Sequence, residues 1–237
     1  MKKAIIIGAT SGLGREIALN LVRKGWSVGV AGRRVELLKE FAIYEQIDVT
    51  AEDAVEGVER LVEKLDGMDL FVNVAGVGFQ NASLDPKVEK HTFDVNGYGF
   101  MRMVGWAYNY FKREKREGHI AVISSIAGTM PLGTAAAYSA TKRMQSHYIT
   151  ALAQLARMEH LSIHFTDIRP GFAATDILNP NKHYPMMMSK ERAGRLATEA
   201  ILRKKRVAVI DWKFAVLSFF WSLIPRCVWE RLTFVKN

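Results

Sequence analysis

The chain has few of the residues that mark secreted or membrane-spanning proteins. Its single cysteine, Cys227, cannot form a disulfide within the chain, which fits a reducing compartment. We expect this thiol to be a small buried hydrophobic group rather than a reactive one. The apolar run that begins the chain is interrupted at Gly8. We therefore interpret that run as a strand rather than a signal peptide and expect a cytoplasmic protein.

Acidic residues are also scarce, since 24 Asp and Glu against 33 Lys and Arg give a formal net charge of +9. A basic chain attracts anionic partners such as nucleic acid or a lipid surface. Most basic residues, however, lie beside acids in helix-like segments such as Lys112–Glu117, which is typical of a solvated helix face. We therefore expect no nucleic-acid partner. The cluster Arg203–Arg206 contains no acid and comes shortly before an apolar tail.

Two motifs indicate chemistry. Three glycines, Gly8, Gly12 and Gly14, follow the first apolar run and begin a helical pattern. A glycine turn at a helix N-terminus presents free N–H groups to a phosphate, so this motif predicts a dinucleotide site. Further along, Tyr138 and Lys142 lie one helical turn apart, where an ammonium stabilises a phenolate and lowers its pKa from the usual ~10. That pair predicts a proton-transfer site, although the same spacing also occurs in surface pairs.

These motifs belong to a larger set in a fixed order: Gly8/Gly12/Gly14, Asn73–Gly76, Asn96, Ser125, Tyr138, Lys142 and Pro170–Gly171. The set resembles the short-chain dehydrogenase/reductase family, in its compact single-domain branch, over about Lys2 to Asp211. The interval of thirteen residues from Ser125 to Tyr138 matches the family too. Two positions depart from its pattern. Val74 stands where a second Asn is usual, and Ala173 replaces a branched aliphatic residue, which predicts a looser nicotinamide contact.

Short apolar runs alternate with amphipathic segments of helix length, which predicts an α/β fold with right-handed crossovers. The chain is long enough for one such domain, and no linker or repeat divides it. We expect a Rossmann-type doubly wound parallel sheet in the order 3-2-1-4-5-6-7, within a catalytic region 1–211 that carries an apolar helical tail, 212–237. The expected strands are Ile5–Ile7, Ser27–Ala31, Glu45–Asp48, Met68–Val74, His119–Ser124, Ser162–Ile168 and Arg206–Asp211.

The resemblance implies catalytic roles for Asn96, Ser125, Tyr138 and Lys142, with no metal ion. Ser125 would donate to a substrate carbonyl oxygen, and Tyr138 would protonate that oxygen as a hydride arrives from a nicotinamide. Lys142 would lower the pKa of Tyr138 and bind the nicotinamide ribose. Asn96 would bend its helix and hold a water that relays protons to Lys142.

The expected cofactor is NADP(H). Relatives that prefer NAD usually have an acid at the end of the second strand, where this chain has Gly32 followed by Arg33 and Arg34. Guanidinium groups match a 2′-phosphate, although both arginines can also simply face solvent, and Ser11 stands where many NADP-preferring relatives have a basic residue. The expected cofactor-binding residues are Gly8, Thr10, Ser11, Gly12, Leu13, Gly14, Arg33, Arg34, Asp48, Val49, Asn73, Ala75, Gly76, Tyr138, Lys142, Pro170, Gly171, Ala173 and Thr175.

Within that set, Asp48 and Val49 resemble the family's adenine-contacting pair. A second interpretation of Asp48 stays open, because Asp followed by Thr50 is also typical of a helix N-cap.

The substrate pocket must come from the remaining loops, namely Phe79, Thr129–Leu132 and 176–189 with Tyr184. Few charges lie there, so we expect an apolar or lipid-like ketone, aldehyde or secondary alcohol. Met186–Met188 either give this pocket an adaptable surface or fill a gap beneath a loop.

The tail is apolar on almost every face over Lys213–Ile224, and Pro225 ends that run. At about 1.5 Å per residue it reaches only ~18 Å, short of the ~30 Å hydrocarbon core. It can lie in an anionic membrane surface, helped by Arg203–Arg206, or dock over its own active site or a partner subunit. We hypothesise that it does both, as a hydrophobic entrance for lipid-like substrates.

The sequence thus favours an NADPH-dependent carbonyl reductase that also oxidises secondary alcohols. A catalytically idle dinucleotide sensor or scaffold is the alternative, and a membrane-surface lipid reductase differs from the first only in location. By resemblance we expect a homodimer or homotetramer formed through the segments Pro86–Glu117 and Ala136–His160. The first segment has more apolar positions than one face toward a sheet needs: Phe100, Met103, Ala107, Tyr110 and Phe111.

Overall fold

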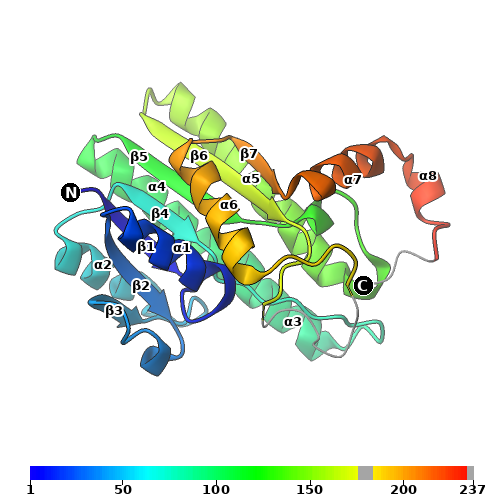
Figure 1. Cartoon of the computed structure of the whole chain (residues 1–237), viewed down its shortest axis with the longest axis horizontal. Coiled ribbons are helices and arrows are strands. Elements are labelled where there is room, and N and C mark those ends of the chain that lie inside the picture. The colour runs from blue at the N-terminus through cyan, green and yellow to red at the C-terminus, as the bar shows by residue number, and fades with distance from the viewer. Residues whose placement is uncertain (176–183, 234–237) are drawn as a thin grey trace.

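The computed structural model describes residues 1–175 and 184–233. Within these residues the centre is a seven-stranded parallel sheet in the order β3-β2-β1-β4-β5-β6-β7, which confirms the predicted fold and strand order (Figure 1). The strands are β1 (Lys3–Ile7), β2 (Ser27–Gly32), β3 (Ile43–Gln46), β4 (Leu70–Asn73), β5 (Gly118–Ile123), β6 (Ile163–Pro170) and β7 (Val207–Ile210).

One predicted strand is displaced. The third strand was expected at Glu45–Asp48 but runs over Ile43–Gln46, where Ile43 and Tyr44 pair with Gly29 and Val30 of β2. After Gln46 the chain leaves the sheet, and Ile47 donates to the carbonyl of Gly32. The apolar residues that suggested a later strand therefore belong to the segment that turns toward the ligand side of the sheet.

Helices cover both faces of the sheet, as Figure 1 shows. On one face, α1 (Gly12–Arg23) packs against α6 (Lys190–Leu202), and on the other lie α2 (Ala54–Leu65), α4 (Phe100–Glu114) and α5 (Ala136–Met158). Two separate apolar clusters fill the space between sheet and helices, which is why the strands are apolar on both faces.

The segment expected as one long helix, 86–117, is divided. It forms α3 (Pro86–Phe93), a π-helical turn (η2, Asp94–Gly99) and then α4. The apolar positions that suggested self-association are all buried within this chain, so its own core accounts for them: Phe100, Met103, Ala107, Tyr110 and Phe111. Self-association keeps only the family resemblance as its support.

The tail follows β7 and forms α7 (Trp212–Leu223) and the short α8 (Arg226–Trp229), drawn in orange and red in Figure 1. Phe214 and Trp229 are buried, whereas Cys227, expected to be buried, is exposed. The cluster 203–206 precedes β7 and α7 follows it, so the two lie at opposite ends of that strand. In the part of the chain that the structure describes, no helix combines the length and apolar character that crossing a membrane requires.

Candidate active site

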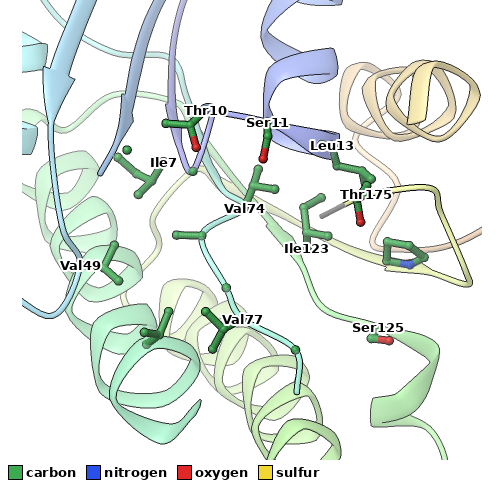
Figure 2. Close-up of a pocket in the computed structure, with 18 of the residues that line it drawn as sticks. Ile7, Thr10, Ser11, Leu13, Val49, Val74, Val77, Ile123, Ser125 and Thr175 are labelled. Carbon is green, nitrogen blue, oxygen red and sulfur yellow. The ribbon is translucent and has the colours of Figure 1, made fainter. Parts of the chain in front are cut away.

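A cleft of about 420 Å³ lies at the carboxyl ends of the strands, where a ligand of a doubly wound sheet is expected. Figure 2 shows Val49 and Ser125 on opposite sides of it, with Val74 and Val77 between them and Thr10 and Ser11 along one edge. Most of the predicted site residues line this cleft: Gly8, Thr10, Ser11, Gly12, Leu13, Arg33, Arg34, Asp48, Val49, Ala75, Gly76, Ser125, Tyr138, Lys142, Pro170, Gly171, Ala173 and Thr175. Gly14, Asn73 and Asn96 are not part of that lining.

The glycine turn brings two strand ends together at the floor of the cleft. Gly8 has a φ of +92°, and a Cβ there would lie 2.5 Å from the backbone nitrogen of Ala75. Only glycine therefore allows the first turn to approach the segment after β4 so closely. Beyond the turn, the N-cap residue Ser11 makes no side-chain cap hydrogen bond. The first N–H groups of α1 thus lack a side-chain partner at the N-cap, which fits a phosphate.

The two arginines after β2 have different surroundings. Arg34 donates from Nη2 to the hydroxyl oxygens of Thr10 (3.1 Å) and Ser11 (2.9 Å), so it ties the glycine turn to the end of β2. Arg33 is exposed, and its charge is one of the influences that lower the pKa of Asp48. Both side chains line the cleft, and the position before them, Gly32, contributes no carboxylate.

Asp48 forms a local turn. Its Oδ1 accepts from the backbone nitrogen (3.0 Å) and the hydroxyl (2.7 Å) of Thr50. Burial raises the pKa of Asp48, but the hydrogen bonds from Thr50 and the charges of Arg33 and His91 together lower it below its usual value. Because α2 starts only at Ala54, with Asp53 as its N-cap, Asp48 does not cap that helix.

The predicted catalytic hydroxyls meet at the end of β5. Ser125 is the N-cap of a short 3-10 turn (η3, Ile126–Gly128), and its Oγ accepts from the backbone nitrogen of Ala127 at 3.1 Å. Tyr138 lies in the first turn of α5 and is partly buried. Burial raises the pKa of Tyr138, and a hydrogen bond with Ser125 opposes that effect. The net direction is upward, opposite to the direction expected from the sequence.

Lys142 is buried one turn further along α5. Its Nζ donates to the carbonyl of Ile123 (2.9 Å) and to Oε1 of Gln145 (3.1 Å), and it lies 5.7 Å from the ring centre of Tyr138. Burial lowers the pKa of Lys142 to about 8, although the nearby charge of Asp167 acts in the other direction. The ammonium is therefore held mainly by neutral acceptors.

Asn96 sits in the π-helical turn, as its predicted effect on helix shape requires. Its side chain accepts from the backbone nitrogen of Val77 (2.8 Å) and donates to the Val77 carbonyl (2.7 Å). Its own carbonyl accepts from Nε2 of Gln145 at 2.8 Å. Sequence reasoning missed Gln145, for which the available signal was a polar residue at a core-facing position three residues after Lys142.

A second, smaller pocket of about 90 Å³ adjoins the cleft, and Ser125, Tyr138 and Gly171 line both. Its walls include the predicted residues Phe79, Leu132 and Tyr184, together with Phe172 and Trp221, which were not predicted. Thr129–Pro131 do not line it, and residues 176–183 lie outside the described part. Of the three methionines, Met188 is buried against Ala173, while Met186 and Met187 are exposed.

The tail docks over this pocket, which is one of the two placements that the sequence left open. Nε1 of Trp229 donates to the carbonyl of Pro131 at 2.8 Å, and its ring meets that of Trp221 edge-on at 5.3 Å. At the base of the tail, Phe214 is fully buried against Gly171, where a Cβ would come within 2.2 Å of the ring. The tail therefore contacts the site at two places, at Pro131 through Trp229 and at Gly171 through Phe214.

The chain is similar to known dehydrogenases along its length. The family model for short chain dehydrogenases matches residues 2–185. An uncharacterized oxidoreductase of Myxococcus xanthus is 30% identical over 97% of this chain and 95% of its own length. An 11-beta-hydroxysteroid dehydrogenase A of Sesamum indicum is 28% identical over 98% of this chain and 70% of its own length.

A solved structure supports the fold. A short chain dehydrogenase/reductase of Burkholderia phymatum in complex with NAD has a TM-score of 0.82 and 19% identity, with 92% of each chain covered. At this identity the likeness concerns the fold alone.

Proposed function

Because the chain belongs to the short-chain dehydrogenase family of oxidoreductases, we propose that it is an NADPH-dependent carbonyl reductase that also oxidises secondary alcohols. The observation that carries the proposal is the junction of the two pockets, where Ser125 and Tyr138 line both the dinucleotide-sized cleft and the aromatic pocket. Two hydroxyls placed between a cofactor and a substrate are what carbonyl reduction requires.

The residues of the cleft fit a nicotinamide dinucleotide. The glycine turn and the start of α1 offer backbone N–H groups to its phosphates, and Pro170, Ala173 and Thr175 line the same cleft, with Thr175 beside Gly12. When bound there, the cofactor supplies or accepts the hydride.

The proton is handled by this chain's own residues. Ser125 donates its O–H to the substrate carbonyl oxygen, since its Oγ already accepts from Ala127. Tyr138 gives its phenolic proton to the same oxygen in reduction and takes it back in alcohol oxidation. The charge of Lys142, buried beside the Tyr138 ring, lowers the cost of the phenolate that results.

The preference for NADPH rests on the end of β2. No acid stands there to repel a 2′-phosphate, and Arg33 is exposed at the rim of the cleft. Arg34 already binds Thr10 and Ser11, so we assign the main phosphate contact to Arg33. The Burkholderia protein holds NAD, and the two chains need not share a preference at such low identity.

The substrate class rests on the aromatic pocket. Phe79, Phe172 and Trp221 give it apolar walls, and no Asp, Glu, Lys, Arg or His is among the described residues that line it. Such a pocket selects an apolar ketone or aldehyde, or the matching secondary alcohol. The sesame relative is named for an 11-beta-hydroxysteroid, which is a compound of this apolar class.

A panel of ketones and aldehydes, arranged by apolar size and charge, tests the proposal through the absorbance of NADPH. We expect turnover that is faster with NADPH than with NADH and that improves from small or charged carbonyls to larger apolar ones. Saturable NADPH binding without turnover on any member would favour the alternative of an idle dinucleotide sensor or scaffold.

The proposal extends to assembly and location. We expect a cytoplasmic homodimer or homotetramer that touches membrane surfaces through the solvent-facing side of α7, formed by Trp212, Val216, Phe219, Phe220 and Leu223. The cluster 203–206 adds nothing to this contact, because it lies at the other end of β7 and its Lys204 pairs with Glu117. Light scattering that shows only monomer contradicts the expected self-association. Failure of the protein to float with anionic liposomes contradicts the expected membrane contact.

A further inference from the structure

Gln145 is a buried residue beside the site to which the proposed mechanism gives no role. It lies on α5, three residues after Lys142, with only 1% of its surface exposed. A buried amide is costly unless both its ends have partners. Here Oε1 accepts from Nζ of Lys142 at 3.1 Å, and Nε2 donates to the carbonyl of Asn96 at 2.8 Å. One side chain therefore links two residues of the catalytic set.

The surroundings of Lys142 restrict what else its ammonium can bind. Of its three N–H groups, one is directed to the Ile123 carbonyl and one to Gln145. Gly76 packs close by, since a Cβ there would lie 3.4 Å from Nζ and 3.1 Å from Oδ1 of Asn96. The remaining N–H is the one available to the cleft, which Lys142 lines.

We propose that Gln145 is a positioning residue: its amide joins the Asn96 carbonyl to the Lys142 ammonium and takes the place of a proton-relaying water between them. The inference rests on the proposed function, since it deepens the role of the same site. A water can pass a proton along, whereas a neutral amide holds its partners without doing so. Lys142 then acts as a fixed charge rather than as a step in a proton path through Asn96.

The charged groups near Lys142 are few and have other partners, so the hydrogen bond from Lys142 to the neutral amide of Gln145 matters for the stability of the ammonium. From β6, Asp167 faces it, but that carboxylate also accepts from Ser124 and Arg169. From α5, Tyr138 is the titratable neighbour. In the π-helical turn, Asp94 is paired with Lys90 at 2.6 Å. The segment Val74–Val77 after β4 has no titratable side chain. Since burial opposes the charged form of Lys142, an acceptor at Oε1 helps to keep it protonated.

Two variants separate this role from simple packing. Gln145→Met keeps the volume but removes both hydrogen bonds, and it leaves no room for water. Gln145→Ala opens a space lined by the Asn96 carbonyl and the Lys142 ammonium, and a polar space of this kind admits water. A packing role predicts more damage from Ala, because a large-to-small change leaves a cavity. The positioning role predicts more damage from Met.

The primary readout is the affinity for NADPH between pH 6 and 10, measured by fluorescence, which needs no turnover. Lys142 is expected to bind the cofactor in its charged form, so wild-type affinity should weaken as the pH rises through about 8. In Gln145→Met this weakening should start about one pH unit lower, so turnover should fall about twofold at pH 7 and about tenfold at pH 9. In Gln145→Ala both changes should be clearly smaller.

The results separate the two proposals. If the wild type turns over no carbonyl, the proposed function fails, while the pH dependence of NADPH binding still tests Gln145. If Gln145→Met matches the wild type in its pH midpoint, or if Gln145→Ala is the more damaged variant, the positioning role is wrong. Should Gln145→Met fail to fold, as judged by circular dichroism, Gln145→Leu replaces it with the same expectation.

Discussion

The cofactor cleft is built around strand ends and a glycine turn, whereas in the aromatic pocket side chains from distant segments form the walls. The cleft depends on strand ends and on a glycine turn that approaches the segment after β4. The pocket depends on Leu132, Phe172 and Trp221, which line it but not the cleft and come from three separate parts of the chain. The difference suggests that substrate choice can change by side-chain substitution while cofactor binding stays the same.

Tyr138 belongs to both regions, so a change there should have the largest effect. Tyr138→Phe removes the proposed proton donor but keeps the ring that lines both pockets. We expect turnover to fall by ~10²–10⁴-fold, the usual loss for a general acid, with NADPH affinity nearly unchanged. Steady-state rates and a fluorescence titration measure the two quantities.

The matched control is Tyr184→Phe, which removes a hydroxyl from the same aromatic pocket without touching the proposed proton donor. Its loss of turnover should be far smaller. A Tyr138→Phe enzyme within a few-fold of the wild type would remove Tyr138 from the mechanism.

Arg33 belongs only to the cofactor side. Arg33→Ala should weaken NADPH binding by ~1–3 kcal/mol, the scale of hydrogen bonds to charged groups, and should leave NADH binding and substrate selectivity nearly unchanged. Arg34→Ala provides the contrast, because Arg34 holds Thr10 and Ser11 and its loss should weaken both cofactors. If Arg33→Ala binds NADPH as tightly as the wild type, Arg33 faces solvent and Arg34 takes its role.

Trp229 belongs only to the substrate side, and its change should have the smallest effect. Trp229→Phe keeps an aromatic ring against Trp221 but loses the hydrogen bond to the Pro131 carbonyl, worth ~0.5–1.5 kcal/mol. We expect a few-fold rise in KM for the larger apolar substrates, with NADPH affinity unchanged. Trp212→Phe is the control, since Trp212 is exposed at the start of α7. A drop in NADPH affinity for Trp229→Phe would show that the two regions are not separable.

The same contrast explains what the sequence could predict. The strand order was predicted correctly, and most of the predicted site residues line one cleft. The glycine turn, Ser125 and the Tyr138–Lys142 pair are local sequence patterns that indicate a position in the fold. Apolar residues are less specific, because the same apolar pattern fits a strand, the chain's own core or a contact with another subunit. Phe100 and Phe111 suggested a subunit contact and instead fill the chain's own core. Ile47 suggested that the third strand continues to Asp48, but it follows the end of β3 and lines the cleft.

The unpredicted residues share a physical reason. Trp221 reaches the pocket because α7 packs beside the segment that follows β6, where Phe214 contacts Gly171 and Phe172, and an apolar run does not specify this tertiary arrangement. Gln145 reaches the Asn96 carbonyl only because the π-helical turn brings that carbonyl beside α5. Gln145 and Asn96 are 49 residues apart along the chain.

The tail is synthesised after the strands and the cleft residues, which determines the order in which these parts can fold. All seven strands and every described residue that lines the cofactor cleft precede Trp212, and during synthesis the N-terminal part of a protein generally folds first, as a unit. The sheet can therefore form a cleft for its dinucleotide while the tail is still inside the ribosome. During that interval Gly171 lacks its cover of Phe214, so the apolar surface beside the site stays open to solvent. The nascent protein would then acquire its cofactor before it can select a substrate.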